Sequence, residues 1–401
     1  MWDVWTRYKT AALGFAVAAV CWPSMIAGSF VPRWAAIAIG VPMVSKMDPR
    51  NLPESMQFSL LFLVALGGVS LLGSPYPLAG VQDLLFIIFL CGAFLLGASL
   101  DSLTILMRGM ACGLALSAGA VVAQNYGWLD LPHDSIQPAG LFFNSELLGE
   151  FSALVFVWAA VRRDVLISAI AGLLILMTQS RVGVLAAAVA LFYAFRPKSL
   201  VLTFALVAAV AMFAIGMMLG FGVDVAKLAS AVHRITLWGA AIMAWSLLGN
   251  GLGWTTAAFP YEQFVHSDAI QAVTELGLGA IALLTIPFVA FKNNRGTNAE
   301  RALFLACCIE VIVSFPLHFP ATGFVAAVVA GYLVSSRPVV WLGEHLSGTE
   351  NGFRHQWWDA ASTGIVGGGG RLRGALPIRS VFAILASLRA RAIGAHTKAT
   401  G

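Results

Sequence analysis

The sequence predicts an all-α integral membrane protein, a polytopic bundle of about twelve transmembrane helices with a long external loop that carries an amphipathic helix. Hydrophobic residues make up 59% of the 401 residues and charged residues only 11%, whereas soluble domains carry about 25% charged residues. Apolar runs long enough to cross a bilayer recur along the chain, and basic residues gather between them on one side. The net charge of +5 reflects this location, and we expect no nucleic-acid partner.

The predicted spans follow from the apolar runs. The stretch 10–45 is interrupted by Pro23, Pro32 and Arg33, and it predicts two helices, the second of them short. The first of these is expected to be retained, because no convincing small-residue cleavage site follows it. The other clear candidates are 57–73, 80–98, 103–123, 147–161, 199–221, 270–291, 302–318 and 320–336.

The apolar run 165–195 is too long for one ordinary span and is interrupted by Thr178–Arg181, with the sequence TQSR. Arg162 and Arg163 precede the run, and Arg196 and Lys198 follow it. Because basic residues favour the cytoplasmic side, both ends are expected there. The run is therefore predicted to be a hairpin whose turn, with Arg181, lies on the external side.

This topology places both termini in the cytoplasm. Of the 24 lysines and arginines, only four fall on the external side: Arg33, Arg181, Lys227 and Arg234. Two external loops are long, roughly 124–146 and 222–267, and apolar residues at helical spacing in the second predict an amphipathic helix on the membrane face. Residues 1–338 are expected to form a transmembrane catalytic domain, and the basic, glycine-containing segment 339–401 a flexible cytoplasmic tail.

Three external residues are candidates for chemistry: Arg181, Arg234 in HRITLW, and His266 in FVHSDAIQ. Guanidinium groups bind phosphate oxygens in a bidentate manner and stay charged at any pH, which suits a diphosphate leaving group. A histidine can take a proton from an attacking hydroxyl near neutral pH. The chain has no Asp-x-Asp pair and its five cysteines lie in apolar segments, so we expect neither a metal nor another cofactor. Each residue alone also fits an ordinary interfacial anchor or a solvated side chain.

Further polar residues are candidates for supporting roles or for binding an acceptor. Asp268, Gln271 and Glu275 are spaced by three and four residues and predict one polar stripe on a helix. Glu310 lies in the middle of an apolar run, where an ionisable residue usually marks a partner or a pathway. Asn144 lies at a loop-to-helix boundary. Ser267 or Asp268, like Asn144, fits a simple helix cap equally well.

Four segments together resemble the O-antigen ligase and O-antigen polymerase superfamily of bacterial membrane glycosyltransferases. They are GLFFNSELLGEF (140–151), MTQSRVGVLAA (177–187), the stretch from RITLWGAA to GNGLGW (234–254), and HSDAIQAVTELGLGA (266–280). Their order, spacing and predicted sidedness fit, and the resemblance covers roughly 135–290. The chain departs from the family pattern at Ser267, where asparagine is frequent, and at Ile270, where an aromatic residue often occurs.

The resemblance implies a helical bundle in the bacterial inner membrane with its active face in the periplasm. It implies metal-independent transfer of a glycan from undecaprenyl diphosphate to an acceptor hydroxyl, which belongs to lipid A–core in a ligase and to another lipid-linked glycan in a polymerase of O-antigen or exopolysaccharide. By position, Arg181 and Arg234 would bind the donor diphosphate. His266 would activate the acceptor hydroxyl or assist departure of the lipid diphosphate. Overall length and the moderate second loop favour a ligase.

Two other classes of function stay open. A transporter or a flippase for lipid-linked sugars would use Glu275 and Glu310 along a polar pathway. The gathering of charges on one face and the absence of an evident internal repeat disfavour this class. A non-catalytic assembly partner is the third possibility.

Overall fold

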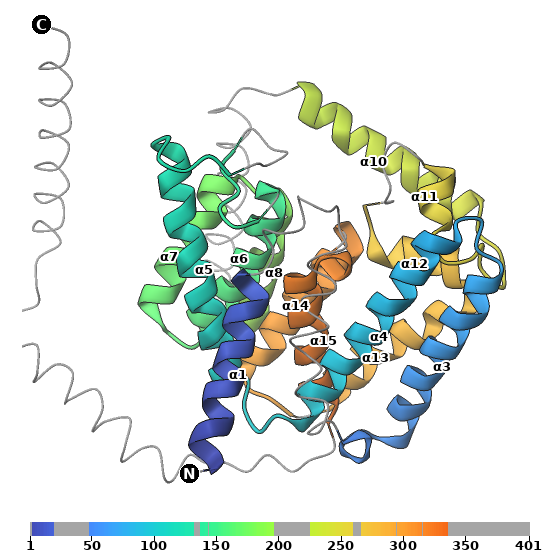
Figure 1. The fold of residues 1–401 in the computed structure, drawn as a ribbon, viewed down its shortest axis with the longest axis horizontal. Coiled ribbons are helices and arrows are strands. Elements are labelled where there is room, and N and C mark those ends of the chain that lie inside the picture. Colours follow the sequence, from blue (N-terminus) through green and yellow to red (C-terminus); the bar gives the residue numbers. More distant parts are fainter. Residues whose placement is uncertain are drawn as a thin grey trace, which may run out of the picture. The chain divides into compact units, whose positions relative to one another are not determined.

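The computed structural model describes residues 2–19, 48–131, 137–142, 144–195, 225–259, 266–293, 295–314 and 316–335. All of them belong to one compact unit, Met1–Val339. Within these ranges every regular element is a helix (Figure 1). The longer helices are α1 (Trp2–Ala19), α3 (Glu54–Leu72), α4 (Pro77–Ser99), α5 (Thr104–Asn125), α6 (Ser145–Val161), α7 (Val165–Thr178), α8 (Arg181–Phe195), α10 (Val225–Met243), α12 (Asp268–Leu276), α13 (Ile281–Lys292), α14 (Asn298–Val313) and α15 (Pro320–Val334).

Four helical segments are long and apolar enough to cross a membrane: α3, α4, α5, and the continuous stretch from α12 to α13. The helices α7, α8 and α15 are apolar but shorter. Over the described residues the fold class is therefore all-α, with four segments that could cross a membrane, whereas a bundle of about twelve spans remains a prediction. The predicted span 199–221, most of the second N-terminal helix and the whole of the tail 339–401 lie outside the described residues.

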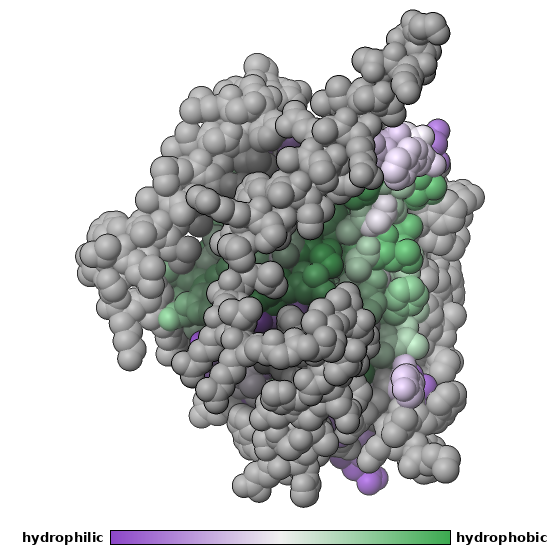
Figure 2. Space-filling view, turned by 90° about the vertical axis from the view of Figure 1, so that its left-hand side faces the viewer, coloured by the Kyte–Doolittle hydropathy of each residue, from purple (hydrophilic) through white to green (hydrophobic). Residues whose placement is uncertain are grey.

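The interior of the bundle is built around α6 and α15, whose residues are buried almost throughout. α6 packs against α7, α8 and α14, and α15 packs against α4. Small residues allow close contact between α4 and α15: a methyl group added at Gly97 or Gly331 would lie only 1.9 Å from a backbone oxygen of the other helix. In Figure 2 the coloured hydrophobic residues form a broad band, with hydrophilic residues near its two ends. Such a band is typical of a protein that spans a membrane.

The predicted hairpin in 165–195 is confirmed as two helices. The α7 helix ends at Thr178, Gln179 takes a left-handed conformation with φ of 54°, and α8 begins at Arg181. The turn thus falls within the predicted segment Thr178–Arg181. Gln179 and Ser180 leave the helical conformation, and the apolar residues on both sides of them are helical.

The predicted span 270–291 corresponds to the stretch Asp268–Lys292, which is long and apolar enough to cross a membrane, but its helix is broken after α12. Gly277 has φ of 56° and ψ of −127°, and a short 3₁₀ helix, η4 (Gly277–Ala280), leads into α13. The loop before α11 (Trp254–Ala258) pairs with the end of α12: Asn250 N–H donates to Thr274 O and Gly251 N–H to Glu275 O. Glycine is needed at this break, since few other residues tolerate such backbone angles.

The predicted amphipathic segment of the second external loop is confirmed as a helix, α10. In Figure 1 it lies across one end of α12 and its neighbours, and it contacts α12 directly. Leu237 and Ala241 are buried on its inner face, where Phe259 and Ile270 pack against them. These contacts fix the position of Arg234, which precedes Leu237 by almost one helical turn.

Candidate functional site

The first turns of α6 form the centre of the candidate site. Asn144 caps the helix, because its side-chain oxygen accepts a hydrogen bond from Glu146 N–H at 2.7 Å. The simple capping role considered for Asn144 is therefore observed. Glu146, Gly149 and Glu150 follow at spacings of three and four residues and share one face of the helix. Three segments that are distant in sequence meet this face.

The first of these segments is α10, through Arg234. Its guanidinium Nη2 donates to Glu146 Oε2 at 3.2 Å, with the Arg234 side chain 21% exposed and that of Glu146 57% exposed. An exposed ion pair of this kind contributes only about 0.2–1 kcal/mol. Arg234 is thus held near α6, and an anion of higher charge could replace Glu146 at small cost.

The second segment is the turn between α7 and α8. A methyl group added at Gly149 would lie 2.2 Å from Ser180 Cβ and 2.5 Å from Thr178 Oγ1. Only a glycine at this position lets the turn rest directly on α6. Arg181, the next residue, is exposed and forms no ion pair with any residue that the structure describes. The structure therefore brings the turn bearing Arg181 to the same face of α6 as Arg234.

The third segment is the beginning of α12, which connects to α6 through the end of α14. Ser314 Oγ donates to Glu150 Oε1 at 2.7 Å, and Ser314 O accepts from Asp268 N–H at 3.0 Å. Ser267 caps α12 through Ile270 N–H and also donates to Ile312 O at 2.8 Å. His266 precedes this cap and has φ of 55°, which is unusual for a residue with a side chain.

Asp268 and Gln271 surround His318, a residue that no pattern in the sequence marks as a candidate. Asp268 Oδ1 lies 2.5 Å from His318 Nδ1, and Asp268 Oδ2 accepts from Leu317 N–H at 2.6 Å. Gln271 Nε2 lies 3.3 Å from His318 Nε2. Because Asp268 is only 3% exposed, it holds the histidine ring firmly in place. Asp268 is therefore a partner of His318 and not the helix cap, which is Ser267.

Glu275 has a structural partner in α11. Its Oε1 accepts from Thr255 N–H at 3.1 Å and from Thr255 Oγ1 at 2.7 Å, and it also lies 3.4 Å from Gln271 Nε2. The predicted polar stripe of Asp268, Gln271 and Glu275 thus exists and faces the protein interior, with each of the three only 3% exposed. Glu275 anchors α11, which begins within the segment GNGLGW.

Glu310 is fully buried in α14, and neither of its carboxyl oxygens has a hydrogen-bond partner among the described residues. It lies close enough to Glu150 for the two carboxyl groups to interact electrostatically. Glu150 is itself 1% exposed. Glu150 follows Glu146 by one helical turn, and the sequence signal for its burial is its position inside the apolar helix α6.

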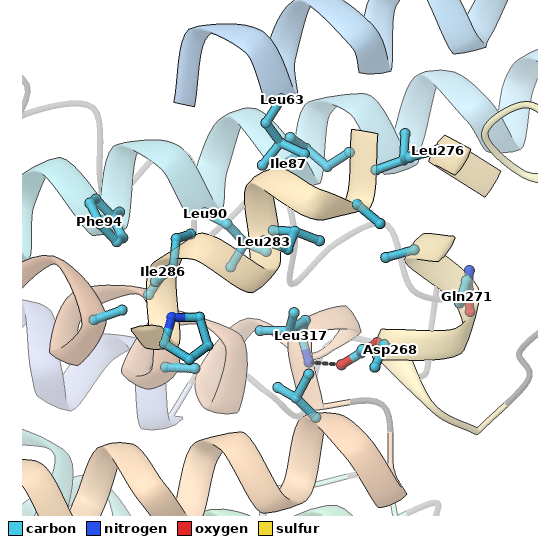
Figure 3. Close-up of a pocket in the computed structure, with 18 of the residues that line it drawn as sticks. Leu63, Ile87, Leu90, Phe94, Asp268, Gln271, Leu276, Leu283, Ile286 and Leu317 are labelled. Atoms are coloured by element: carbon cyan, nitrogen blue, oxygen red, sulfur yellow. Dashed lines mark hydrogen bonds between the residues drawn. The ribbon is translucent and has the colours of Figure 1, made fainter. Parts of the chain in front are cut away.

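A cavity of about 500 Å³ opens beside His318 (Figure 3). Asp268 and Gln271 lie at one end of it, and Phe94 and Ile286 lie toward the other. Its walls come from α3, α4, α12, α13, α14 and α15 and are mostly aliphatic. Arg181, Arg234 and His266 are not among the lining residues.

Comparison of the chain with models of protein families gives no match, and a search of curated proteins finds none that is significantly similar. The described residues contain no group of three or more histidine, cysteine, aspartate or glutamate side chains arranged to hold a metal ion. The site is thus defined by its own geometry. Arg234 and the turn bearing Arg181 lie at the first turns of α6, and a largely buried histidine–carboxylate cluster lies beside an apolar cavity. The first can bind an anion, and the second can hold or exchange hydroxyl protons.

Proposed function

We propose that this protein is a membrane glycosyltransferase that transfers a glycan from undecaprenyl diphosphate to an acceptor hydroxyl, in the manner of an O-antigen ligase. The proposal rests on the four-segment sequence resemblance. One structural observation supports it above others: the segments bearing Arg181, Arg234 and His266 converge on the same turns of α6 through Gly149, Glu146 and the Ser314–Glu150 hydrogen bond. Arg181 and His266, the most distant of the three, are 85 residues apart in the chain (266 − 181).

In this proposal the donor diphosphate displaces Glu146 from Arg234 and also binds Arg181. The pair between Arg234 and Glu146 is partly exposed, so exchanging one carboxylate oxygen for charged phosphate oxygens is favourable. The acceptor oxygen then attacks the anomeric carbon of the donor sugar. The bond from that carbon to the diphosphate oxygen breaks, and its electron pair leaves with the lipid diphosphate. His266 takes the proton of the acceptor hydroxyl, and the arginines neutralise the leaving group.

The experiment is glycan transfer by purified protein in detergent, with a lipid-diphosphate-linked glycan and a hydroxyl acceptor. Arg181→Ala and Arg234→Ala should each lower kcat/KM by about a hundredfold or more, as loss of one charge-stabilising donor does in other enzymes. Arg163→Ala is the matched control. Arg163 is also exposed but lies at the opposite end of α7, so its replacement should leave transfer unchanged.

Transfer at the wild-type rate by Arg181→Ala would contradict the proposal. A ligase and a polymerase are distinguished by deletion in cells. Loss of a ligase removes all attached O-chain from lipid A–core, whereas loss of a polymerase leaves single repeat units. We favour the ligase, and a deletion strain that retains single attached units would assign the chain to the polymerases.

The proposal includes a location. We place the protein in the bacterial inner membrane with about twelve spans, both termini in the cytoplasm and the α6 site at the periplasmic face, because basic residues are concentrated on the other side. Cysteine scanning checks this: a cysteine at Gln179 should react with a membrane-impermeant thiol reagent in intact spheroplasts, and one at Arg163 should react only after lysis.

Transport of lipid-linked sugars is the second candidate, and the buried pair of Glu150 and Glu310 is the observation that favours it. Two carboxyl groups in an apolar interior need a proton or a cation for compensation, and such groups occur along transport pathways. Movement of a lipid-linked sugar across vesicles by purified protein, without formation of a glycosidic bond, would support this candidate against the transferase.

A further inference from the structure

The cavity beside His318 differs from the arginine site in its chemistry. Its volume of about 500 Å³ falls within the range of about 300–1,000 Å³ that is typical of small-molecule sites. Most of the wall is aliphatic or aromatic, with Leu63, Ile87, Leu90 and Ile286 among the residues that Figure 3 labels. A cavity of this volume with a mostly apolar wall suits a hydrocarbon chain.

The polar end of the cavity determines which head group can accompany that chain. Among the residues that the structure describes, the lining includes Asp83, Asp268, Gln271, Glu275 and His318 and no arginine or lysine. Carboxylates repel phosphate groups and accept hydrogen bonds from hydroxyl groups. A lipid phosphate or diphosphate would therefore be disfavoured at this end, whereas an alcohol would be favoured.

Gln271 provides a second and independent indication of a ligand. Its side chain is 3% exposed, it lines the cavity, and its Oε1 has no hydrogen-bond partner among the described residues. A buried amide oxygen without a partner costs about 1–3 kcal/mol, and a ligand hydroxyl would remove that cost. Asp268 meanwhile fixes the neighbouring His318 ring through its Nδ1.

We propose that the cavity binds the aliphatic chain of a lipid whose head group is an uncharged alcohol, with the hydroxyl group donating a hydrogen bond to Gln271 Oε1. This inference does not depend on the transferase assignment. If both hold, the alcohol site and the diphosphate site are separate, with the first beside His318 and the second at the outer turns of α6.

The test uses the purified full-length chain and two photoreactive probes with the same diazirine-bearing C16 chain, one ending in a primary alcohol and the other in a phosphate monoester. We expect the alcohol probe to label the protein at a concentration at least about tenfold lower than the phosphate probe requires. This ratio is equivalent to about 1.4 kcal/mol. Cross-linked peptides should come from α4, α12, α13 or α15. Equal or preferential labelling by the phosphate, or cross-links confined to other helices, would overturn the proposal.

Variants that fill the cavity provide the matched comparison. Ala327→Phe and Ala272→Phe place a ring among its lining residues, and each should abolish labelling by the alcohol. Ala65→Phe makes the same change at an exposed position of α3 and should leave labelling intact. Gln271→Leu tests the head group and should remove most of the preference for the alcohol. Labelling of either folded cavity variant at the wild-type level would contradict the proposal. If neither variant folds, the comparison of the two probes on the wild-type chain decides.

Discussion

Removal of the Asp268 carboxylate should destabilise the protein through two specific losses. Asp268 is 3% exposed, accepts from Leu317 N–H at 2.6 Å and pairs with His318 Nδ1 at 2.5 Å. In Asp268→Ala both partners lose their hydrogen bonds inside the bundle. Each buried polar group left without a partner costs about 1–3 kcal/mol, so the free energy of unfolding should fall by about 2–6 kcal/mol.

Asp268→Asn should be much milder, because its amide oxygen can still accept from Leu317 N–H. Its NH₂ group would face His318 Nδ1, which can act as an acceptor if the ring proton moves to Nε2. A rotated Gln271 amide would then present its oxygen to Nε2. With these adjustments the hydrogen bonds of residue 268 and His318 are replaced, and only the one from Gln271 Nε2 to Glu275 Oε1 is lost. The expected cost is therefore about 0.5–1.5 kcal/mol, the net value of one hydrogen bond.

The assay is unfolding by sodium dodecyl sulfate in mixed micelles, followed by tryptophan fluorescence. A double-mutant cycle with His318→Ala isolates the interaction between the two side chains, and residues in one hydrogen-bond network typically give coupling energies of about 0.5–3 kcal/mol. An Asp268→Ala protein as stable as Asp268→Asn, or a coupling energy of zero, would refute the assignment of Asp268 as the group that fixes His318.

Three further predictions concern packing and buried charge. Gly149→Ala should separate α6 from the α7–α8 turn and lower the free energy of unfolding by several kcal/mol. Gly68→Ala, whose new methyl group meets no atom within 4 Å, should raise the free energy of unfolding by about 0.5–1 kcal/mol. Equal effects of the two variants in unfolding titrations would contradict the close packing at Gly149. Gly277→Ala should cost about 1–3 kcal/mol or more, because φ of 56° and the Gly249 backbone disfavour a side chain; unchanged stability would be unexpected. Glu310→Gln should preserve folding on size-exclusion chromatography yet reduce activity, whereas loss of folding with it would indicate a structural role.

Much of the fold could be predicted from the apolar runs alone. The predicted spans 57–73, 80–98 and 103–123 correspond to α3, α4 and α5, since each is a single apolar run of ordinary length bounded by polar residues. The break in the hairpin at Gln179 followed from polar residues inside an apolar run together with basic residues at both ends. Composition and charge were sufficient for these elements.

The break at Gly277 could not be predicted in the same way. Leu276, Gly277 and the residues after them continue an apolar run, and a glycine inside such a run is often tolerated in a helix. The break depends on the approach of the loop around Gly249, nearly thirty residues earlier in the chain. Contacts between distant segments of this kind leave no periodicity in the sequence.

Some residues of the candidate site could also be predicted from the sequence, and others could not. Arg181, Arg234 and His266 could be chosen from their charge and position, and the polar stripe of α12 from its spacing. His318 was missed because it lies in the apolar segment FPLHFP, where a single histidine has no pattern around it. Its importance appears only when Asp268, fifty residues earlier, is found beside its ring.

The most direct test of the account is release of lipid diphosphate by the purified protein, measured together with formation of the new glycosidic bond in detergent and with a metal chelator present. We predict that the wild-type chain and Arg163→Ala release lipid diphosphate in step with glycan transfer, and that Arg181→Ala does neither. Folded wild-type protein that forms no glycosidic bond from any lipid-diphosphate-linked glycan, or an Arg181→Ala variant that transfers as fast as the wild type, would contradict it.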